Sequence, residues 1–300
     1  LSLSVQGKKV NMTSPDGKYQ FTLSDSGGQL HYSLTWNGKQ TVKPSLLGIN
    51  ANVEWRDGVE IGTVDSSRKD TIWHPVYGEK SEIKDCYNAW KILVNRQNGR
   101  DKLILDVRAY DEGIAFRYHF PGGQYLKITD EYTEYTMPEG TKAYFTPKAQ
   151  TPYSYLPLEN WPGESDRPLL LTLADGGYVC LTEAQVVDYV RTKFNVSSTK
   201  KNTIISAMYG PVEDIAPYST PWRVIMCADK PGEILEHNDI LLNLNPPCRI
   251  KDTSWIKPGK VMREVTLTTE GGKALVDFAV KRKLQYIHFD AGWYGFEYDK

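Results

Sequence analysis

Short segments of alternating apolar and polar residues, separated by turn sequences, most constrain how this chain can fold. Apolar residues recur at a period of two over 19–23, directly after the turn sequence Pro-Asp-Gly at 15–17. Residues 30–36 alternate in the same way and stop at Asn37-Gly38, a strong signal for a two-residue β-hairpin. The first part of the chain is therefore predicted to form antiparallel strands joined by tight turns.

The same pattern continues toward the middle of the chain. Residues 103–110 place apolar side chains on one face, a turn follows at 111–113, and 114–120 again reads as a strand. Residues 169–184 form two further apolar segments around Asp-Gly-Gly at 175–177. Many strands with little helical periodicity predict a large antiparallel sandwich. The absence of a repeat of fixed length disfavours a propeller.

The pattern changes after about residue 230. Apolar residues within 233–244 fall at helical spacing, and Asn-Pro-Pro at 245–247 ends that predicted helix. Residues 252–261 are expected to be a connector, with Trp255 as an anchor. A second helix is predicted over 270–284, followed by a strand from Leu284 to Phe289. A helix, a short loop and a strand in succession are typical of an α/β fold. We therefore expect an all-β domain over 1–250 and the start of an α/β domain over 251–300.

This α/β segment is too short to be a domain by itself. One helix and one strand leave both strand edges unpaired and one helix face uncovered. A closed barrel needs about 250 residues, far more than the segment supplies. We therefore expect the chain to be part of a longer protein, whose barrel remainder would be its structural partner.

Composition excludes several classes of function. The formal net charge is -1 and no Lys/Arg-rich run is present, so neither nucleic acid nor an anionic membrane is an expected partner. No apolar stretch approaches the roughly 20 residues of a membrane span, and no signal peptide opens the sequence. The four cysteines form no CxxC pair and are expected to be buried small side chains. The 19 tyrosines and 8 tryptophans suit carbohydrate stacking, but a large β-sheet alone would also explain them.

Three places could carry chemistry. Asp290 ends the last predicted strand before a small-residue turn, and Trp293 follows, so a sugar could hydrogen-bond the acid and stack on the ring. The alternative is an aspartate that caps the turn. Asn160 and Glu164 lie in an oxygen-rich loop that could hold calcium, a hard cation that takes 6–8 oxygen ligands. Glu183, which follows an apolar strand, could be a further ligand or simply a strand-end residue. The alternative for that loop is a solvated acidic surface. Arg223, within an apolar strand, could pair with a carboxylate or bind substrate.

The ordered motifs SPDGKYQFTL, SLLGI, LTEA, TPWRVI, LNPPCRIKDTSWIKPGKV and VDFAVKRKLQYIHFDAGWYG resemble glycoside hydrolase family 97 across the whole chain. The resemblance implies an N-terminal β-super-sandwich over 1–250, followed over 251–300 by a linker and the first elements of a catalytic (β/α)8 barrel that this chain does not complete. Strand 284–289 would then be the first barrel strand.

The family comprises exo-acting α-glycosidases with calcium at the active site. The resemblance favours a retaining α-galactosidase that acts on oligosaccharides with a terminal α-linked hexose. An inverting α-glucosidase and a non-catalytic carbohydrate-binding module are the alternatives. Both catalytic carboxylates would lie beyond Lys300, so this chain alone should be inactive. Asn160 is the best match for a calcium ligand, with Glu159, Glu164 and Glu183 as alternatives, and Asp290 is similar to sugar-binding acids of related barrels. The protein is expected to be periplasmic or otherwise exported.

Overall fold

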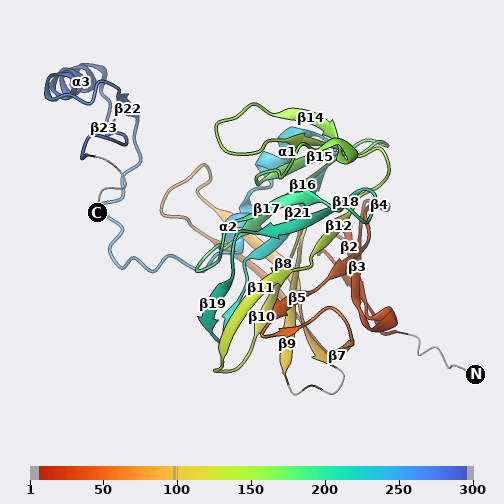
Figure 1. The fold of residues 1–300 in the computed structure, drawn as a ribbon. Coiled ribbons are helices and arrows are strands. Elements are labelled where there is room, and N and C mark those ends of the chain that lie inside the picture. The colour runs from red at the N-terminus through yellow and green to blue at the C-terminus, as the bar shows by residue number, and fades with distance from the viewer. Residues whose placement is uncertain (1–6, 97–98, 100, 296–300) are drawn as a thin grey trace, which may run out of the picture. The chain divides into compact units, whose positions relative to one another are not determined.

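A computed structural model describes residues 7–96, 99 and 101–295 of the chain (Figure 1). The chain divides into two compact units: the first contains the residues up to Trp73 and Lys84–Pro247, and the second contains His74–Ile83 and the residues from Cys248. Within the described residues the strands form four sheets, of ten, seven, four and two strands. The predicted division at residue 250 concerns the domains of a longer protein and stays a prediction.

The seven-stranded and ten-stranded sheets form most of the first unit. The seven-stranded sheet runs, in spatial order, through β1 (Lys9–Thr13), β2 (Tyr19–Ser24), β3 (Leu30–Trp36), β4 (Lys39–Leu47), β12 (Glu134–Thr136), β18 (Thr203–Met208) and β17 (Thr192–Val196). The ten-stranded sheet runs through β14 (Ser154–Pro157), β13 (Lys142–Phe145), β15 (Leu169–Thr172), β16 (Tyr178–Ala184), β21 (Trp222–Ala228), β10 (Ile114–Phe120), β9 (Lys102–Tyr110), β8 (Ile83–Arg96) and β7 (Val59–Trp73), with β20 (Tyr218–Ser219) paired to β10.

A smaller sheet and short helices complete the first unit. The four-stranded sheet consists of β19 (Val212–Ile215), β11 (Tyr125–Glu131), β5 (Ile49–Ala51) and β6 (Val53–Glu54). The helices are η1 (Ser26–Gly28), η2 (Leu158–Asn160), α1 (Pro231–Glu236) and α2 (Asp239–Asn243). Helix α1 contacts β21 and α2 contacts β16 (Figure 1).

A continuous apolar core joins the two large sheets. Phe21 of β2 and Tyr32 of β3 stack at 5.0 Å between ring centres, and the ring of Phe116 in β10 lies 5.9 and 5.4 Å from them. All three side chains are at most 1% exposed. Aromatic contacts of this kind hold the inner faces of packed sheets together. The predicted mainly β fold with antiparallel sheets is therefore confirmed.

The alternating pattern predicts the orientation of the strand side chains correctly. The predicted inward face of β9 is buried at Leu103, Leu105, Val107 and Ala109. At the hairpin between β3 and β4, Asn37 and Gly38 have φ angles of 50° and 76°. Positive φ at both central residues is what a turn matched to the strand twist requires, which explains the Asn-Gly sequence.

The single helix predicted over 233–244 is wrong. The segment forms α1 and α2 with a break at His237, whose φ and ψ are -89° and 6°. The break turns the second helix so that Ile240 and Leu244 are buried, whereas Leu235 and Leu242 of the predicted stripe are 73% and 48% exposed. Burial against β21 and β16 thus overrides the helical spacing of the sequence.

The second unit contains the two-stranded sheet and one longer helix. β22 (Val261–Glu264) and β23 (Tyr286–Phe289) are parallel, and α3 (Thr269–Arg282) connects them. The Thr268 hydroxyl caps α3 by accepting a hydrogen bond from the Gly271 N–H at 3.0 Å, and Lys283 ends it in the left-handed conformation with φ 56°. The predicted second helix and following strand are confirmed, with ends shifted by one or two residues.

The prediction that strand 284–289 comes first in the α/β segment is wrong, because β22 precedes it and pairs with it. The sequence showed only a connector there, since β22 has four residues and three of them are exposed, so no apolar alternation marks it. Across the described residues, the helices are all too short or too polar to cross a membrane.

Candidate functional site

The predicted substrate-binding acid lies at the carboxyl end of a parallel strand. Asp290 follows β23 directly, and its Oδ1 accepts a hydrogen bond from the Ala291 N–H at 2.8 Å. Its Oδ2 lies 2.9 Å from Nη2 of Arg263 on the neighbouring β22. The Ala291 hydrogen bond, and then the Arg263 charge, lower the pKa of the Asp290 carboxyl. The group is therefore ionised near neutral pH and suited to accept hydrogen bonds rather than to donate a proton.

Aromatic rings lie next to this acid. Trp293 is 60% exposed, and its ring centre lies 6.3 Å from Phe289 and 5.5 Å from Tyr294. An exposed, flat ring in this position can stack against the C–H face of a sugar. The structure thus places Asp290 and Trp293 on one short segment, as the sequence suggested, while their role in binding remains a prediction.

Sequence reasoning missed Glu264, the last residue of β22. It is 4% exposed and accepts hydrogen bonds from the N–H and hydroxyl of Thr266, at 2.9 and 2.6 Å, and from the Leu267 N–H. The Thr266 hydroxyl contributes most to lowering the pKa of the Glu264 carboxyl. Glu264 therefore shapes the turn that leads into α3. Because the sequence did not reveal β22, it also gave no reason to single out the last residue of that strand.

A buried ion pair joins two sheets of the first unit. Arg223 of β21 is 0% exposed, and its Nε donates a hydrogen bond to Oε1 of Glu131 at 2.8 Å. Glu131 ends β11 and is 6% exposed. The guanidinium also donates from Nη1 to Oε2 of Glu183 at 2.6 Å. The charge of Arg223 is therefore compensated by a bidentate contact to Glu131 and a third hydrogen bond to Glu183.

The ion pairs continue from Glu183 to a second buried arginine. Arg167 Nε lies 3.7 Å from Glu183 Oε2 and donates a hydrogen bond to the Thr192 hydroxyl at 2.9 Å. Its guanidinium lies over the Phe194 ring, 3.8 Å from the ring centre. Two arginines and two glutamates thus form one compact network with balanced charge.

This network is built for stability and not for proton transfer. Burial acts to raise the pKa of Glu131, but the charge and hydrogen bonds of Arg223 outweigh it, so the pKa lies below its usual value. A general acid must hold its proton near neutral pH, which these arginines prevent. The alternative in which Arg223 pairs with a carboxylate is confirmed. Its partner Glu131 lies 92 residues away in the sequence, so the sequence alone did not identify Glu131 as the partner.

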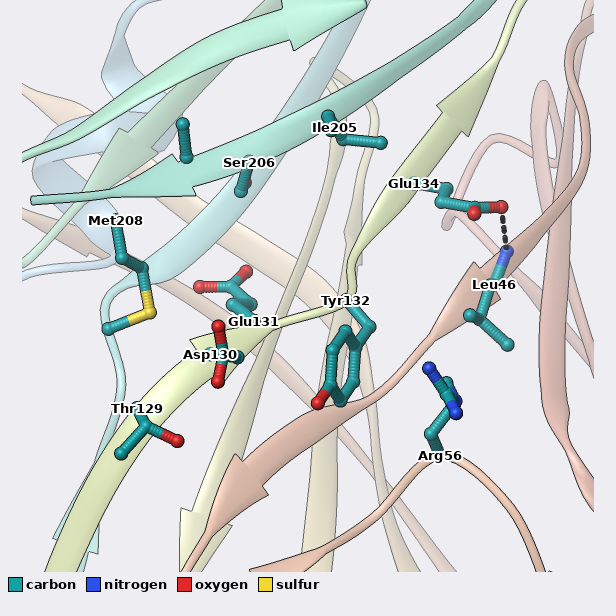
Figure 2. Close-up of a pocket in the computed structure, with 11 residues that line it drawn as sticks. Leu46, Arg56, Thr129, Asp130, Glu131, Tyr132, Glu134, Ile205, Ser206 and Met208 are labelled. Atoms are coloured by element: carbon teal, nitrogen blue, oxygen red, sulfur yellow. Dashed lines mark hydrogen bonds between the residues drawn. The ribbon is translucent and has the colours of Figure 1, made fainter. Parts of the chain in front are cut away.

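Glu131 of this network also lines a cavity of about 360 Å³ (Figure 2). Figure 2 shows Tyr132 between Glu131 and Glu134 along the chain, with Met208 and Ser206 on the opposite strand. Oε2 of Glu134 accepts a hydrogen bond from the Leu46 N–H at 3.3 Å, and both of its oxygens accept from Lys200 Nζ outside the cavity lining. The acids lining this cavity are thus largely paired with cations of the same unit.

Glu164 and Glu183, two of the candidate calcium ligands, belong to no cluster of metal-ligating side chains among the described residues. In the portion of the chain that the structure describes, no three His, Cys, Asp or Glu side chains are placed to hold a metal ion. Oε2 of Glu164 accepts a hydrogen bond from the Tyr209 hydroxyl. Glu159 is exposed in η2, and the side chain of Asn160 lies outside the described part. Because Glu183 is bound by Arg223, its charge is poorly available to a cation.

The fold is shared with solved structures of carbohydrate-active enzymes. A glycoside hydrolase family 97 enzyme from Pseudoalteromonas sp. strain K8, solved in complex with panose, superposes with a TM-score of 0.86 and 25% sequence identity, over 95% of this chain and 48% of that one. A β-arabinopyranosidase superposes with a TM-score of 0.82 and 20% identity over 95% of this chain and 51% of that one, which shows a common fold. These similarities place the chain in a fold class that includes glycoside hydrolases.

The particular family follows from the sequence itself. The family described as Glycosyl-hydrolase 97 N-terminal matches residues 12–247. The retaining alpha-galactosidase of Bacteroides thetaiotaomicron is 25% identical over 98% of this chain and 51% of its own length. The chain belongs to glycoside hydrolase family 97, and the resemblance found in its motifs is confirmed. It spans about half the length of the curated relatives that it matches.

Proposed function

We propose that the protein carrying this chain is a retaining, exo-acting α-galactosidase. The observation that carries the proposal is the 25% identity to a retaining alpha-galactosidase over 98% of the chain, together with the family match over residues 12–247. Its substrate would be an oligosaccharide with a terminal α-linked galactose. The first unit would support the catalytic domain, and the β22–α3–β23 segment would begin a (β/α)8 barrel, because both edges of its two-stranded sheet are open to further strands.

The described residues suit binding better than bond cleavage. Asp290, ionised and at a strand end, would accept hydrogen bonds from two hydroxyls of the terminal sugar, and Trp293 would stack on its ring. A retaining reaction needs a nucleophile and an acid/base carboxyl about 5 Å apart. Glu131 and Glu183 share Arg223 and cannot take these roles. We place the catalytic pair in the barrel remainder, beyond Lys300.

Calcium and export are further parts of the proposal. A calcium ion near the reacting sugar would supply Lewis-acid stabilisation and orient the substrate. Of the predicted ligands with a described side chain, Glu164 fits better than Glu183, since it accepts a hydrogen bond from the Tyr209 hydroxyl and not from an arginine. Asn160, four residues before Glu164 in the sequence, stays a proposed ligand. Glu183 would require release from Arg223. We expect the mature protein to be periplasmic or otherwise exported.

Hydrolysis by the longer protein tests the activity. p-Nitrophenyl α-galactoside should be cleaved faster than the α-glucoside and the β-L-arabinopyranoside. Proton NMR of the first product should show the α-anomer, as retention requires. A chelator should abolish turnover and added calcium should restore it. Failure to cleave any of the three substrates would refute the proposed activity. If the chelator had no effect, only the proposed role of calcium would be refuted.

An inverting α-glucosidase is the second candidate. It is favoured by the Pseudoalteromonas relatives, which were solved with panose and with acarbose at the same identity of 25%. Faster cleavage of the α-glucoside with β-glucose as first product would select this alternative.

A non-catalytic module is the other alternative, and an assay of residues 1–300 alone tests it. Measurable turnover would exclude the module, because it would place the catalytic pair within this chain.

A further inference from the structure

A second cavity, of about 310 Å³, lies on the ten-stranded sheet and differs from the first in its charge. Its walls include Ser66 and Ser67 of β7, Lys91 of β8, Arg108 of β9 and Arg117 of β10. We call it the basic hollow. Ligand pockets in proteins commonly reach this size, which accommodates a single sugar ring. No step of the proposed reaction uses these residues.

Arg108 is the unusual residue of the basic hollow. Its guanidinium carbon lies 4.8 Å from the ring centre of Trp222 and 4.6 Å from that of Tyr87, so the planar group lies against two aromatic rings. The Trp222 ring is shared with Arg117, at 4.2 Å. Its one hydrogen bond goes from Nη1 to the Tyr110 hydroxyl, at 3.4 Å. Across residues 7–96, 99 and 101–295, no carboxylate forms an ion pair with it. An arginine has five N–H donors, so most of this group's capacity is unused.

The neighbouring charges do not neutralise Arg108. The buried carboxylate of Asp106 accepts from Lys91 Nζ and from Arg117 Nε, each at 3.1 Å, and so is already shared by two cations. The remaining acid of the lining, Asp65, lies on the exposed part of β7. Three cationic side chains and two carboxylates therefore face the basic hollow, and the surplus charge is positive.

The geometry points to the basic hollow as a binding site for a small oxyanion-bearing ligand, such as the carboxylate of an acidic monosaccharide. Arg108, fixed in orientation by its two rings, would donate a bidentate pair of hydrogen bonds to the oxyanion. Ser66 and Ser67 are consecutive in β7 and point to opposite faces, so one of the two hydroxyls can donate a further bond to the ligand. The same chemistry would accept a free inorganic anion, and the experiment separates the two sources.

Binding of galacturonate, sulfate and galactose to the protein, measured by isothermal titration calorimetry at low and high salt, tests the site. Galacturonate should bind and galactose, which has the same ring without the charge, should not. Arg108→Met should weaken galacturonate binding about tenfold or more, as the loss of a charge-assisted pair predicts. Arg108→Lys, which keeps the charge, should weaken it less. Tight binding of sulfate with none of galacturonate would overturn the acidic-sugar assignment.

A matched control separates this effect from folding. Arg96 also lies over a tryptophan, 5.9 Å from the Trp55 ring centre, but it has a carboxylate partner in Asp101 at 3.6 Å. Arg96→Met should leave galacturonate binding unchanged. Thermal unfolding of each variant, recorded in parallel, identifies any that has lost its fold. Unchanged binding in a folded Arg108→Met variant, equal binding of galactose, or no binding of any probe would each overturn the proposal.

Discussion

Replacing Arg223 with methionine tests the interpretation of the buried network directly. The guanidinium is fully buried, and it makes hydrogen bonds to both oxygens of Glu131 and to Oε2 of Glu183. Methionine has a similar length and no charge, so the variant removes the interaction without leaving a large void. Glu183 keeps Arg167 as a partner, but Glu131 loses its only arginine contact among the described ion pairs.

The expected loss is large because a buried charge remains without its partner. Breaking one side of a buried ion pair typically costs about 3–5 kcal/mol of unfolding free energy. Glu131→Gln alone should cost less, since Arg223 keeps Glu183. In the double variant, the loss should be smaller than the sum of the two single losses by at least about 1 kcal/mol, as expected for residues in one network.

The pH dependence gives an independent check. Because Arg223 lowers the folded-state pKa of Glu131, the stabilisation is present above the unfolded-state pKa of about 4.3 and is lost as pH falls through the lower folded-state value. In Arg223→Met, burial without the arginine raises that pKa. Urea unfolding at neutral pH and near pH 4 should therefore show the largest difference from wild type at neutral pH.

Arg191→Met serves as the control, since its pair with Asp166 at 2.9 Å involves a side chain that is 57% exposed. Its effect on the urea midpoint should be small, because exposed pairs contribute little. A loss below about 1 kcal/mol for Arg223→Met, or a loss of equal size at both pH values, would refute the account of a charge-compensated network.

Three further predictions concern the rest of the chain. Trp293→Ala in the longer protein should raise KM about fivefold, because stacking on a sugar ring contributes on the order of 1 kcal/mol; an unchanged KM and kcat would make Trp293 a packing residue. Gly272→Ala should lower the melting temperature, since its Cβ would lie 2.9 Å from a ring carbon of β23, whereas Gly232→Ala in open space should not. Burial raises the pKa of Cys180 and Cys227 to about 12, so a thiol reagent at pH 8 should modify only the exposed cysteine before denaturation.

Local sequence signals predicted most of the first unit because hairpins are local structures. The alternation over 30–36 and the Asn37-Gly38 turn specify β3 and the start of β4 without reference to the rest of the chain. The order of strands within each sheet was not predictable. β12 lies between β4 and β18, and its partners come from distant parts of the sequence, so only tertiary packing selects them.

The two errors in the fold have the same physical origin. Residues 233–244 carry a helical period, yet packing of Ile240 against the sheet breaks the helix at His237. β22 carries no apolar period, yet it pairs in register with β23. In both cases a contact between residues distant in sequence decides the local structure. The local pattern of apolar residues carries no information about such contacts.

The candidate site shows a similar division. The position of Asp290 at a strand end was predictable because a strand followed by a small-residue turn is a local pattern, while its role stays a prediction. Arg223 within an apolar strand indicated either a carboxylate partner or a bound substrate, and it did not identify Glu131 or Glu183 as the partners. Glu131 follows an aspartate in a polar stretch, Ile128 to Tyr132, and reads as a solvent-exposed residue until β11 and β21 are brought together.

The carboxyls with raised pKa values bear on where catalysis can occur. A retaining glycosidase needs one carboxyl that stays protonated near neutral pH beside one that is ionised. In the described residues burial raises the pKa of Asp111 and Glu112. They are adjacent in the tight turn between β9 and β10, where Asp111 accepts a hydrogen bond from the Asp16 N–H at 2.8 Å. Neither lines either of the two cavities described above. Their raised pKa values thus follow from hairpin packing, which supports the proposal that the acid/base pair lies in a barrel outside the described residues.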